Sequence, residues 1–573
     1  PNTAAMLLRS GGLTYHHEPL DGLTIQQKQL FYVPADRQFT TTEIDSYEGL
    51  LYDAYYVMDP EQSTIVASRP ALTIAWMGML GMLGGERAML YVTPFFGAAS
   101  LVIAYFVGKR VFDSGTGALA AVWLLVSFPQ LHFSRTPYAE TVGQFFVLTF
   151  LYAVAAYVQT RRLLFVPMSL AALTAAFSAR IDSILALATL FLFMVFLAAR
   201  RDWRGLGASV ACMTVAAGFT MWTVNRPYVG ATAELMLFGQ LRSLQQLMPY
   251  AVPLGICALA GLALFVTLRR FVSSPPWLQR TIRWGLSVAI VLGVGYALYL
   301  RPLIPEYTQL GGQVVPTYNE ELMAVAAEYV SPLLLWLAAL GAILILQRRR
   351  IPPEQVLFLV FVLSFGAILF WKYTTARVFP VALRRWMPEV FPGLCLLGAF
   401  AVRWLAQRPR LRWGATAIAG LTAALIMAVS APYWFHLGAQ GALELVETLA
   451  ERIPSDAVIL LEPEQDNAVA GWLAAPLWSI EQRDALLLNS GELDGTLLDE
   501  TVCGWQRQGR DVYIIALNDP ETWWPGEFSG HEEDQAVWDS SIIGQSLHFP
   551  PYVWRFAFTF SVYEWDGISC PSF

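Results

Sequence analysis

Long apolar stretches alternate with short polar segments through most of the chain. Twelve stretches of about 20 mainly apolar residues lie between Ala88 and Ala431, and a helix of about that length crosses the hydrocarbon core of a membrane. The pattern therefore predicts a multi-pass α-helical membrane protein. The predicted spans are residues 88–107, 115–130, 139–158, 164–180, 183–199, 205–224, 250–268, 284–300, 329–346, 354–371, 388–404 and 413–431.

Basic residues mark every second connection between these spans, for example at 109–110, 161–162 and 348–350. Short loops rich in Lys and Arg stay on the cytoplasmic side, so the connections between them are expected outside. Because twelve is an even number, both ends of the chain are also expected outside the cytoplasm. An outer N-terminal segment needs a preceding helix, so a thirteenth span is expected upstream of Pro1.

The pattern divides the chain into three regions. Residues 1–87 form a first extracytoplasmic loop, expected to be irregular with short helices and to end in an interfacial helix over 71–83. Residues 88–431 contain the transmembrane spans, and residues 432–573 change to short alternating elements that indicate a small extracytoplasmic α/β domain. Its predicted elements are helices at 441–452 and 492–506 and strands at 457–461, 511–517 and 554–565.

Composition agrees with this class. Hydrophobic residues make up 56% and charged residues 14% of the chain, and the mean hydropathy is +0.47. The net charge of −7 argues against nucleic acid as a partner. Cys503 and Cys570 both lie in the predicted outer domain, where a disulfide between them is permitted and two unpaired thiols are the alternative. The spacing of Cys and His resembles no zinc site, so we predict no metal and no cofactor.

Ionisable residues at the outer ends of the spans are the candidates for chemistry, because charges next to a membrane are costly unless they are paired or used. Arg135 and Glu140 flank an outer turn that contains Pro137. Arg180 and Asp182 lie at another outer turn between two short spans. For the first pair, a purely structural ion pair between Arg135 and Glu140 is the competing interpretation.

Arg384 and Arg385 open the eleventh predicted span on the outer side, against the preference of basic residues for the inside. A guanidinium group binds phosphate through two parallel hydrogen bonds, so a phosphate is one partner that fits this pair. Lipid headgroups or the nearby Glu389 are alternative partners.

Several segments, in this order, resemble the GT-C superfamily of membrane glycosyltransferases, near the branch of protein O-mannosyltransferases and lipid A aminoarabinose transferases. The resemblance covers nearly the whole chain and includes the predicted count of thirteen helices and the outer C-terminal domain. It rests on Ser68-Arg69-Pro70-Ala71-Leu72, Gly84-Gly85-Glu86-Arg87-Ala88, Gly108-Lys109-Arg110-Val111-Phe112, residues 118–140 and Ala179-Arg180-Ile181-Asp182.

The resemblance implies a transferase that moves a hexosyl or pentosyl unit from a polyprenyl-phosphate carrier to an acceptor outside the cytoplasmic membrane, with inversion. The acceptor, whether glycan, lipid or protein, is not encoded by any motif. Such enzymes use a carboxylate in the first outer loop as general base, and basic residues hold the phosphate, which gains negative charge as it leaves.

The resemblance also implies roles for particular residues. Arg69 matches the basic residue before proline that contacts the donor phosphate, and Arg384 and Arg385 match basic residues that open a late helix. Arg135 is a further candidate for the phosphate. Glu140 matches an acidic position of the second outer loop where relatives usually carry Asp.

The general base is the open position. In the family it sits just after the first helix, which places it upstream of Pro1 or near it. Asp45 and Glu48 are the alternatives within the chain, although a solvated loop is the competing reading for both.

Two other classes of protein share a multi-pass architecture. A transporter or lipid flippase would be expected to show internal repeats with matching broken helices, and the span pattern shows no such repeat. A noncatalytic membrane protein that binds sugar or lipid is the third interpretation.

Overall fold

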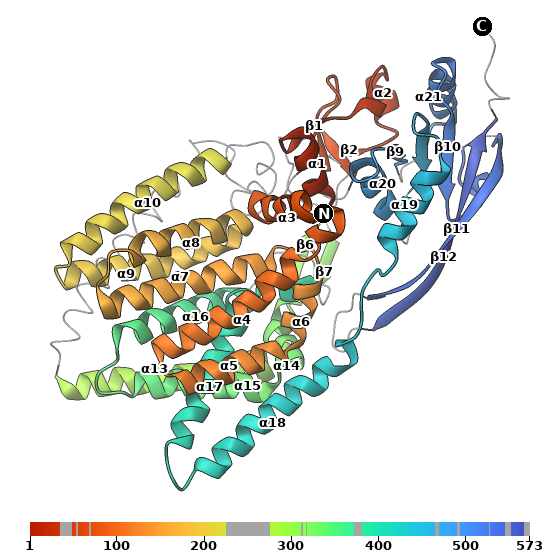
Figure 1. The fold of residues 1–573 in the computed structure, drawn as a ribbon. Helices are drawn as coiled ribbons and strands as arrows, with labels where there is room; N and C mark the ends of the chain where they lie inside the picture. Colours follow the sequence, from red (N-terminus) through yellow and green to blue (C-terminus); the bar gives the residue numbers. More distant parts are fainter. Residues whose placement is uncertain are drawn as a thin grey trace.

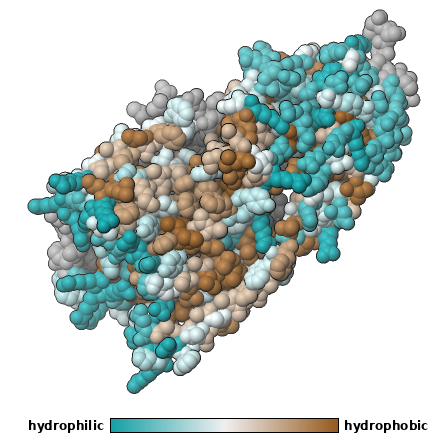
Figure 2. All heavy atoms as spheres, in the orientation of Figure 1, coloured by the Kyte–Doolittle hydropathy of each residue, from teal (hydrophilic) through white to brown (hydrophobic). Residues whose placement is uncertain are grey.

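Most helices gather in one bundle, and the two larger sheets lie beyond one end of it together with several shorter helices (Figure 1). This arrangement comes from a computed structural model, in which apolar residues cover much of the bundle and polar residues cover the C-terminal region (Figure 2). The structure describes the chain except residues 35–47, 53–54, 68–69, 225–274, 311–312, 317, 372–380, 464–468, 490–492, 526–527, 545–551 and 567–573.

Within the described part of the chain, five helical segments are long and apolar enough to cross a membrane. The multi-pass helical class is therefore found, whereas the predicted count of twelve spans stays a prediction, since the span at 250–268 lies outside the described residues. The five are α4 (Val92–Val111), α7 (Glu140–Thr160), α13 with its continuation (Pro276–Leu303), α16 (Pro353–Trp371) and α18 with its last turn (Arg412–Tyr433). Shorter apolar helices are α8 (Phe165–Ala179), α9 (Leu187–Ala199) and α17 (Val390–Ala406). Helix α10 (Trp203–Val224) also lies in the bundle.

Two predicted straight spans are broken, which corrects the sequence analysis. The stretch predicted at 115–130 is α5 (Ser114–Leu125) followed by α6 (Phe128–Arg135), bent by 63°. The stretch predicted at 329–346 belongs to α14 (Leu322–Val330) and α15 (Pro332–Leu346), and the pair is bent by 103°. Each second helix begins with a proline in its first turn, where the missing N–H costs nothing, and this favours a new helix over a continued one.

Helix α3 (Ala71–Met89) covers the predicted interfacial segment and runs beyond it. It departs from helical geometry at Gly84 and Gly85, and Gly85 has φ 75°, a conformation that L side chains rarely adopt. This break separates the segment before Gly84 from the approach to α4.

Several polar connections meet at one end of the bundle. The Gln159 side chain, at the end of α7, donates to the Arg110 carbonyl at 2.8 Å and to Glu354 at 3.0 Å, next to the start of α16. Arg161 pairs with Asp202 at 2.6 Å, just before α10. These connections, predicted to be cytoplasmic, therefore lie together, away from the end where α7 begins.

Residues 1–70 were expected to be an irregular loop with short helices. Short helices are present, as α1 (Asn2–Ser10) and α2 (Ile25–Lys28), but the irregular loop is wrong for the described part. Short strands form a five-stranded antiparallel sheet in the order β1-β5-β4-β3-β2. Aromatic and β-branched runs such as 55–57 and 64–66 favour strands, but the many turn residues around them masked this signal. The strands are β1 (Thr14–His16), β2 (Val33–Pro34), β3 (Gly49–Tyr52), β4 (Tyr55–Asp59) and β5 (Thr64–Ala67).

The C-terminal region contains the predicted α/β elements. Its sheet has the order β11-β12-β10-β8-β9, in which β8, β9 and β10 are parallel and the long strands β11 and β12 are antiparallel. The elements foreseen from sequence are α19 (Ala442–Arg452), β8 (Val458–Leu461), α21 (Gly495–Arg507), β10 (Val512–Ala516) and β12 (Val553–Trp565). The unforeseen ones are α20 (Val469–Ser479), β9 (Asp484–Leu487) and β11 (Gly530–Ile543).

The described cysteines agree in part with the predicted disulfide. Cys503 in α21 is disulfide-bonded, while Cys212 and Cys395 in the bundle are free. The predicted partner of Cys503, Cys570, lies outside the described residues.

The N-terminal sheet packs against the C-terminal domain through buried aromatic rings. His17 stacks on Trp478 of α20, with ring centroids 5.0 Å apart, and its Nε2 lies 2.9 Å from the Tyr52 hydroxyl. That hydroxyl in turn donates to the carbonyl of Ala485 in β9. The two regions therefore share one core, although more than 400 residues separate some contacting pairs, as with the 433 between Tyr52 and Ala485.

This core predicts a pH dependence of stability. Complete burial lowers the pKa of His17 from 6.5 to about 3. Between those values the unfolded chain binds a proton that the folded chain does not, so stability is expected to fall as the pH falls, by up to about 1.4 kcal/mol per pH unit. Thermal unfolding followed by tryptophan fluorescence should show this slope, and a His17→Gln variant should lose it. An equal slope in both proteins would contradict the prediction.

Candidate functional site

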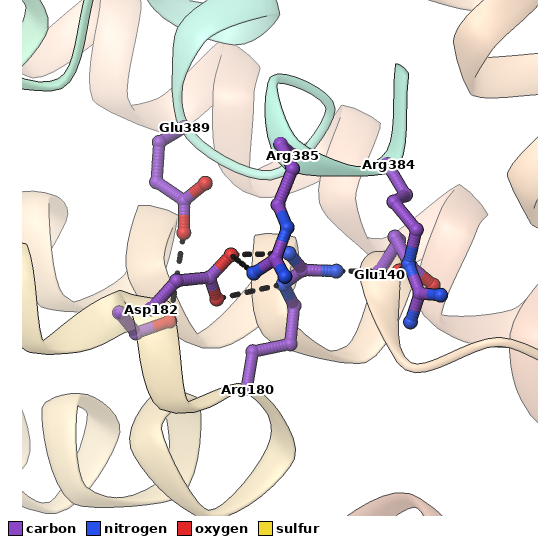
Figure 3. Close-up of polar contacts among 7 residues, drawn as sticks. Glu140, Arg180, Asp182, Arg384, Arg385 and Glu389 are labelled. Carbon is purple, nitrogen blue, oxygen red and sulfur yellow. Dashed lines mark hydrogen bonds and ion pairs between the residues drawn. The ribbon is translucent and has the colours of Figure 1, made fainter. Parts of the chain in front are cut away.

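Six charged side chains from separate segments converge where the bundle meets the sheets (Figure 3). Two residues of neighbouring helices at this end, Val142 and Ala179, belong to the same core as the N-terminal sheet and the C-terminal domain. The segments include the 3₁₀ turns η3 (Ile181–Ala186) and η7 (Val381–Arg385). The six side chains are Glu140, Arg180, Asp182, Arg384, Arg385 and Glu389, and we call them the charged cluster.

Arg180 is the centre of the cluster. Its side chain is only 6% exposed and forms ion pairs with both Glu140 and Asp182. Its Nε also donates to Asp182 Oδ1 at 3.0 Å, so the pairing with Asp182 is bidentate. Such a two-pronged contact fixes the plane of the guanidinium group.

Glu140 connects two arginines. Its fully buried carboxylate accepts from Arg180 and from Arg384 Nε at 2.8 Å, both through Oε1. Arg384 also lies over the ring of Tyr138, 5.2 Å from its centroid. The competing interpretation from the sequence, an ion pair between Arg135 and Glu140, is therefore wrong.

Arg385 completes the pairing of Asp182, with Nη1 3.0 Å from Oδ2. Burial differs sharply within the cluster. The side chains of Arg180, Arg385 and Glu140 are 8% exposed or less, whereas that of Arg384 is 28% exposed. Arg384 is thus the arginine of the cluster that is most accessible from outside.

Local sequence explains how these side chains meet. Helix α8 ends at Ala179, and extended backbone at Arg180 turns its side chain toward α7. Gly143 lies one turn after Glu140, and a Cβ there would stand 2.9 Å from Cδ of Arg180. Gln144 donates to the Met387 carbonyl at 3.1 Å, which ties α7 to the segment that carries Arg385 and Glu389.

A Gly143→Ala substitution tests this close approach. The added methyl group would push the stem of Arg180 aside and strain its contacts with Glu140 and Asp182, at a cost of roughly 1–3 kcal/mol. We expect a lower unfolding temperature and weaker binding of any anion that the cluster holds. Gly420→Ala in α18, where an added Cβ meets no atom within 4 Å, is the control. Equal behaviour of the two variants would count against the close packing.

Two apolar hollows adjoin the cluster. One of about 810 Å³ lies between α3, α8 and α10 and reaches Ser178, two residues before Arg180. The other, of about 400 Å³, lies between α13, α15, α16 and α17 and reaches Val390, the neighbour of Glu389. Both are lined mainly by aliphatic and aromatic side chains.

The remaining predicted site residues lie elsewhere. Arg135 is exposed and donates to the carbonyls of Tyr433 and His436, at 3.2 and 3.4 Å, at the entrance to the C-terminal domain. Glu48 is exposed at the start of β3 in the N-terminal sheet. Arg69 and Asp45 lie outside the described residues.

The place of Glu389 within the cluster was not predicted from the sequence, which suggested only that this carboxylate neutralises the arginines. The absence of a bound metal stays a prediction. Over the described ranges, His531, Glu533 and Glu564 form one group with metal-ligand spacing. It lies at the surface of the C-terminal sheet, and His531 is already paired with Glu533 and Asp566.

No protein-family model matches the chain, and no curated protein sequence matches it. Among solved structures, the chain is similar to the archaeal oligosaccharyltransferase AglB from Archaeoglobus fulgidus in complex with an inhibitory peptide and a dolichol-phosphate. The TM-score is 0.45 and the identity 12%, over 91% of this chain and 69% of that chain.

Two further solved structures are similar to the chain. ArnT from Cupriavidus metallidurans bound to undecaprenyl phosphate has a TM-score of 0.37 and 11% identity, over 100% of this chain and 97% of that chain. The arabinofuranosyltransferase AftD from Mycobacteria has a TM-score of 0.37 and 14% identity, over 98% of this chain and 40% of that chain.

Proposed function

We propose that the protein is a membrane glycosyltransferase that takes a sugar from a polyprenyl-phosphate carrier and passes it to an acceptor at the outer face of the membrane. The observation that carries this proposal is the charged cluster. Three guanidinium groups meet two paired carboxylates where the apolar bundle joins the soluble regions. A lipid-linked phosphate needs this combination of buried positive charge and adjacent apolar surface.

Arg384 is the residue best placed to receive the phosphate. It contacts Glu140 through Nε and, among the described residues, makes no other hydrogen bond. Its two terminal nitrogens therefore stay available to an anion, and its partial exposure gives that anion access. Arg180 and Arg385 supply further positive charge behind it.

The apolar hollows beside the cluster fit the carrier chain. A polyprenyl group has no hydrogen-bonding atoms, so apolar walls suffice to hold it. Because the hollows reach Ser178 and Val390, a chain in either one brings its phosphate close to the cluster.

The chemistry follows from charge. When the acceptor displaces the carrier, the leaving phosphate gains negative charge, and fixed guanidinium groups stabilise it without reorganisation. Glu140 serves best by holding Arg180 and Arg384 in place, because two cationic partners favour its ionised form and make it a poor proton acceptor. The general base then lies elsewhere, with Asp45 and Glu48 as the candidates within the chain, and a single displacement inverts the sugar.

The proposed orientation places the cluster, the N-terminal sheet and the C-terminal domain outside the cytoplasm, as the alternating basic connections predict. Acceptor and donor would meet between the cluster and these soluble regions. A glycan, a lipid and a protein are all compatible acceptors.

Reconstitution into liposomes tests the function. Sugar-loaded polyprenyl phosphates are supplied with candidate acceptors, and the release of free polyprenyl phosphate is measured. Acceptor-dependent release by the wild type, strongly reduced in Arg384→Ala at donor concentrations below the wild-type KM, is the expected result. Movement of the intact carrier between leaflets without release would instead support a flippase, and carrier binding without either event a noncatalytic protein.

A further inference from the structure

Glu389 differs from the other two carboxylates of the charged cluster because, within the described parts of the chain, no cation pairs with it. Its side chain is 2% exposed, and Ser183 Oγ, 3.5 Å from Oε1, is a distant donor. Its Oε2 is buried and has no hydrogen-bond partner among the described residues. Glu140 and Asp182, by contrast, each pair with two arginines.

An ionised carboxylate in this position would be strongly disfavoured. Burial removes its hydration, and a buried carboxyl without a paired cation takes up a proton instead. The charged groups that face it are Asp182 and Arg180 on one side and Arg385 on the other. Both arginines are already engaged by Asp182, whose own charge repels a second negative charge.

Protonation of Glu389 changes the charge of the whole cluster. Three arginines and two ionised carboxylates leave one net positive charge. If Glu389 also ionised, the cluster would be neutral. A sugar-loaded polyprenyl phosphate is a phosphodiester and carries one negative charge.

We propose that Glu389 is held as a neutral carboxylic acid. Because Glu389 stays protonated, the cluster keeps the single net positive charge that a phosphodiester donor requires. This inference rests on the proposed function and deepens it, because it identifies the charge state of the ligand. Glu389 is a positioning residue here. It acts on the donor through the net charge of the arginines and does not contact the phosphate.

Infrared spectroscopy of the purified full chain tests the charge state without any donor. A protonated carboxylic acid has a carbonyl stretching band that an ionised carboxylate lacks. We expect this band in the wild type at neutral pH and expect Glu389→Gln to remove it. Glu354→Gln at the opposite end of the bundle is the matched control and should retain it. A neutral-pH spectrum that Glu389→Gln leaves unchanged would overturn the inference, while the proposed function would stand.

Binding of a donor analogue tests how protonation of Glu389 affects the affinity of the cluster for a phosphodiester. The probe is a polyprenyl methyl phosphodiester, whose single charge does not change with pH. Its affinity for the wild type should fall roughly tenfold between about pH 6 and pH 9 as Glu389 ionises. Glu389→Gln, which cannot ionise, should bind as tightly as the wild type at the lower pH and keep that affinity throughout. Glu389→Asp should retain a pH dependence.

The outcomes separate the two proposals. Equal pH profiles of the wild type and Glu389→Gln would overturn the role of Glu389 alone. Failure of the wild type to bind the probe at any pH would overturn the phosphate-binding role of the cluster and, with it, the proposed function.

Discussion

Glu140→Gln is expected to cost about 3–5 kcal/mol of stability and to reduce sugar transfer by at least about a hundredfold. Glutamine has nearly the shape of glutamate but no charge, so it leaves the buried Arg180 with a single carboxylate partner and Arg384 with none. Losing one partner of a buried ion pair is more harmful than losing both. Thermal unfolding in detergent and initial transfer rates measure the two effects.

Two further variants test whether the effect of Glu140→Gln comes from the lost charge. Glu140→Asp keeps the charge on a shorter side chain and should lose less of both properties, because one of the two contacts can still form. Glu354→Gln, at the opposite end of the bundle, removes a carboxylate that accepts from Gln159 and should change neither by much. Normal stability and transfer in Glu140→Gln would show that the cluster does not depend on this carboxylate.

Arg384→Ala is expected to raise the KM for the donor by roughly 10 to 100-fold, because a charge-assisted hydrogen bond to the phosphate contributes about 1.5–3 kcal/mol. Stability should change little, since Arg384 is partly exposed and Arg180 still neutralises Glu140. Steady-state kinetics over a range of donor concentrations measure the effect.

Arg135→Ala is the matched control. It removes an exposed arginine that donates to backbone carbonyls of Tyr433 and His436, away from the cluster, and we expect an unchanged KM. If Arg135→Ala raised the KM and Arg384→Ala did not, the phosphate site would lie at the entrance to the C-terminal domain instead.

The membership of the cluster could largely be predicted from sequence, but its pairing could not. Charged residues at the apolar ends of helices are visible one by one, and Glu140, Arg180 and Arg384 were all identified in this way. Their contacts join residues 40 and 244 positions apart and depend on how α7, α8 and η7 pack. Spacing favoured the nearby Arg135, whereas packing selected the distant arginines.

Glu389 was hard to assign for a related reason. Its proposed function depends on having no cation partner among the described residues, which only three-dimensional surroundings reveal. The sequence pattern showed only an acidic residue close to Arg384 and Arg385 and suggested mutual neutralisation.

The fold followed the hydrophobic pattern where that pattern was strong. The apolar spans and the strands of the C-terminal domain, such as β10 (Val512–Ala516), have clear periodicity. The N-terminal sheet has strands of two to five residues, too short for a periodic signal, and gains its stability from contacts with Trp478 far along the chain. The bends before Pro129 and Pro332 also fall in or beside stretches that the hydrophobic pattern assigned to single spans.

The most direct measurement of the central claim is an experimental structure of the full chain with bound polyprenyl phosphate. The phosphate is predicted to lie within hydrogen-bond distance of Arg384, with Arg180 and Arg385 behind it and the polyprenyl chain in one of the adjoining hollows. A phosphate bound at the opposite, basic end of the bundle, with the ion pairs of Glu140 and Asp182 undisturbed, would contradict the account.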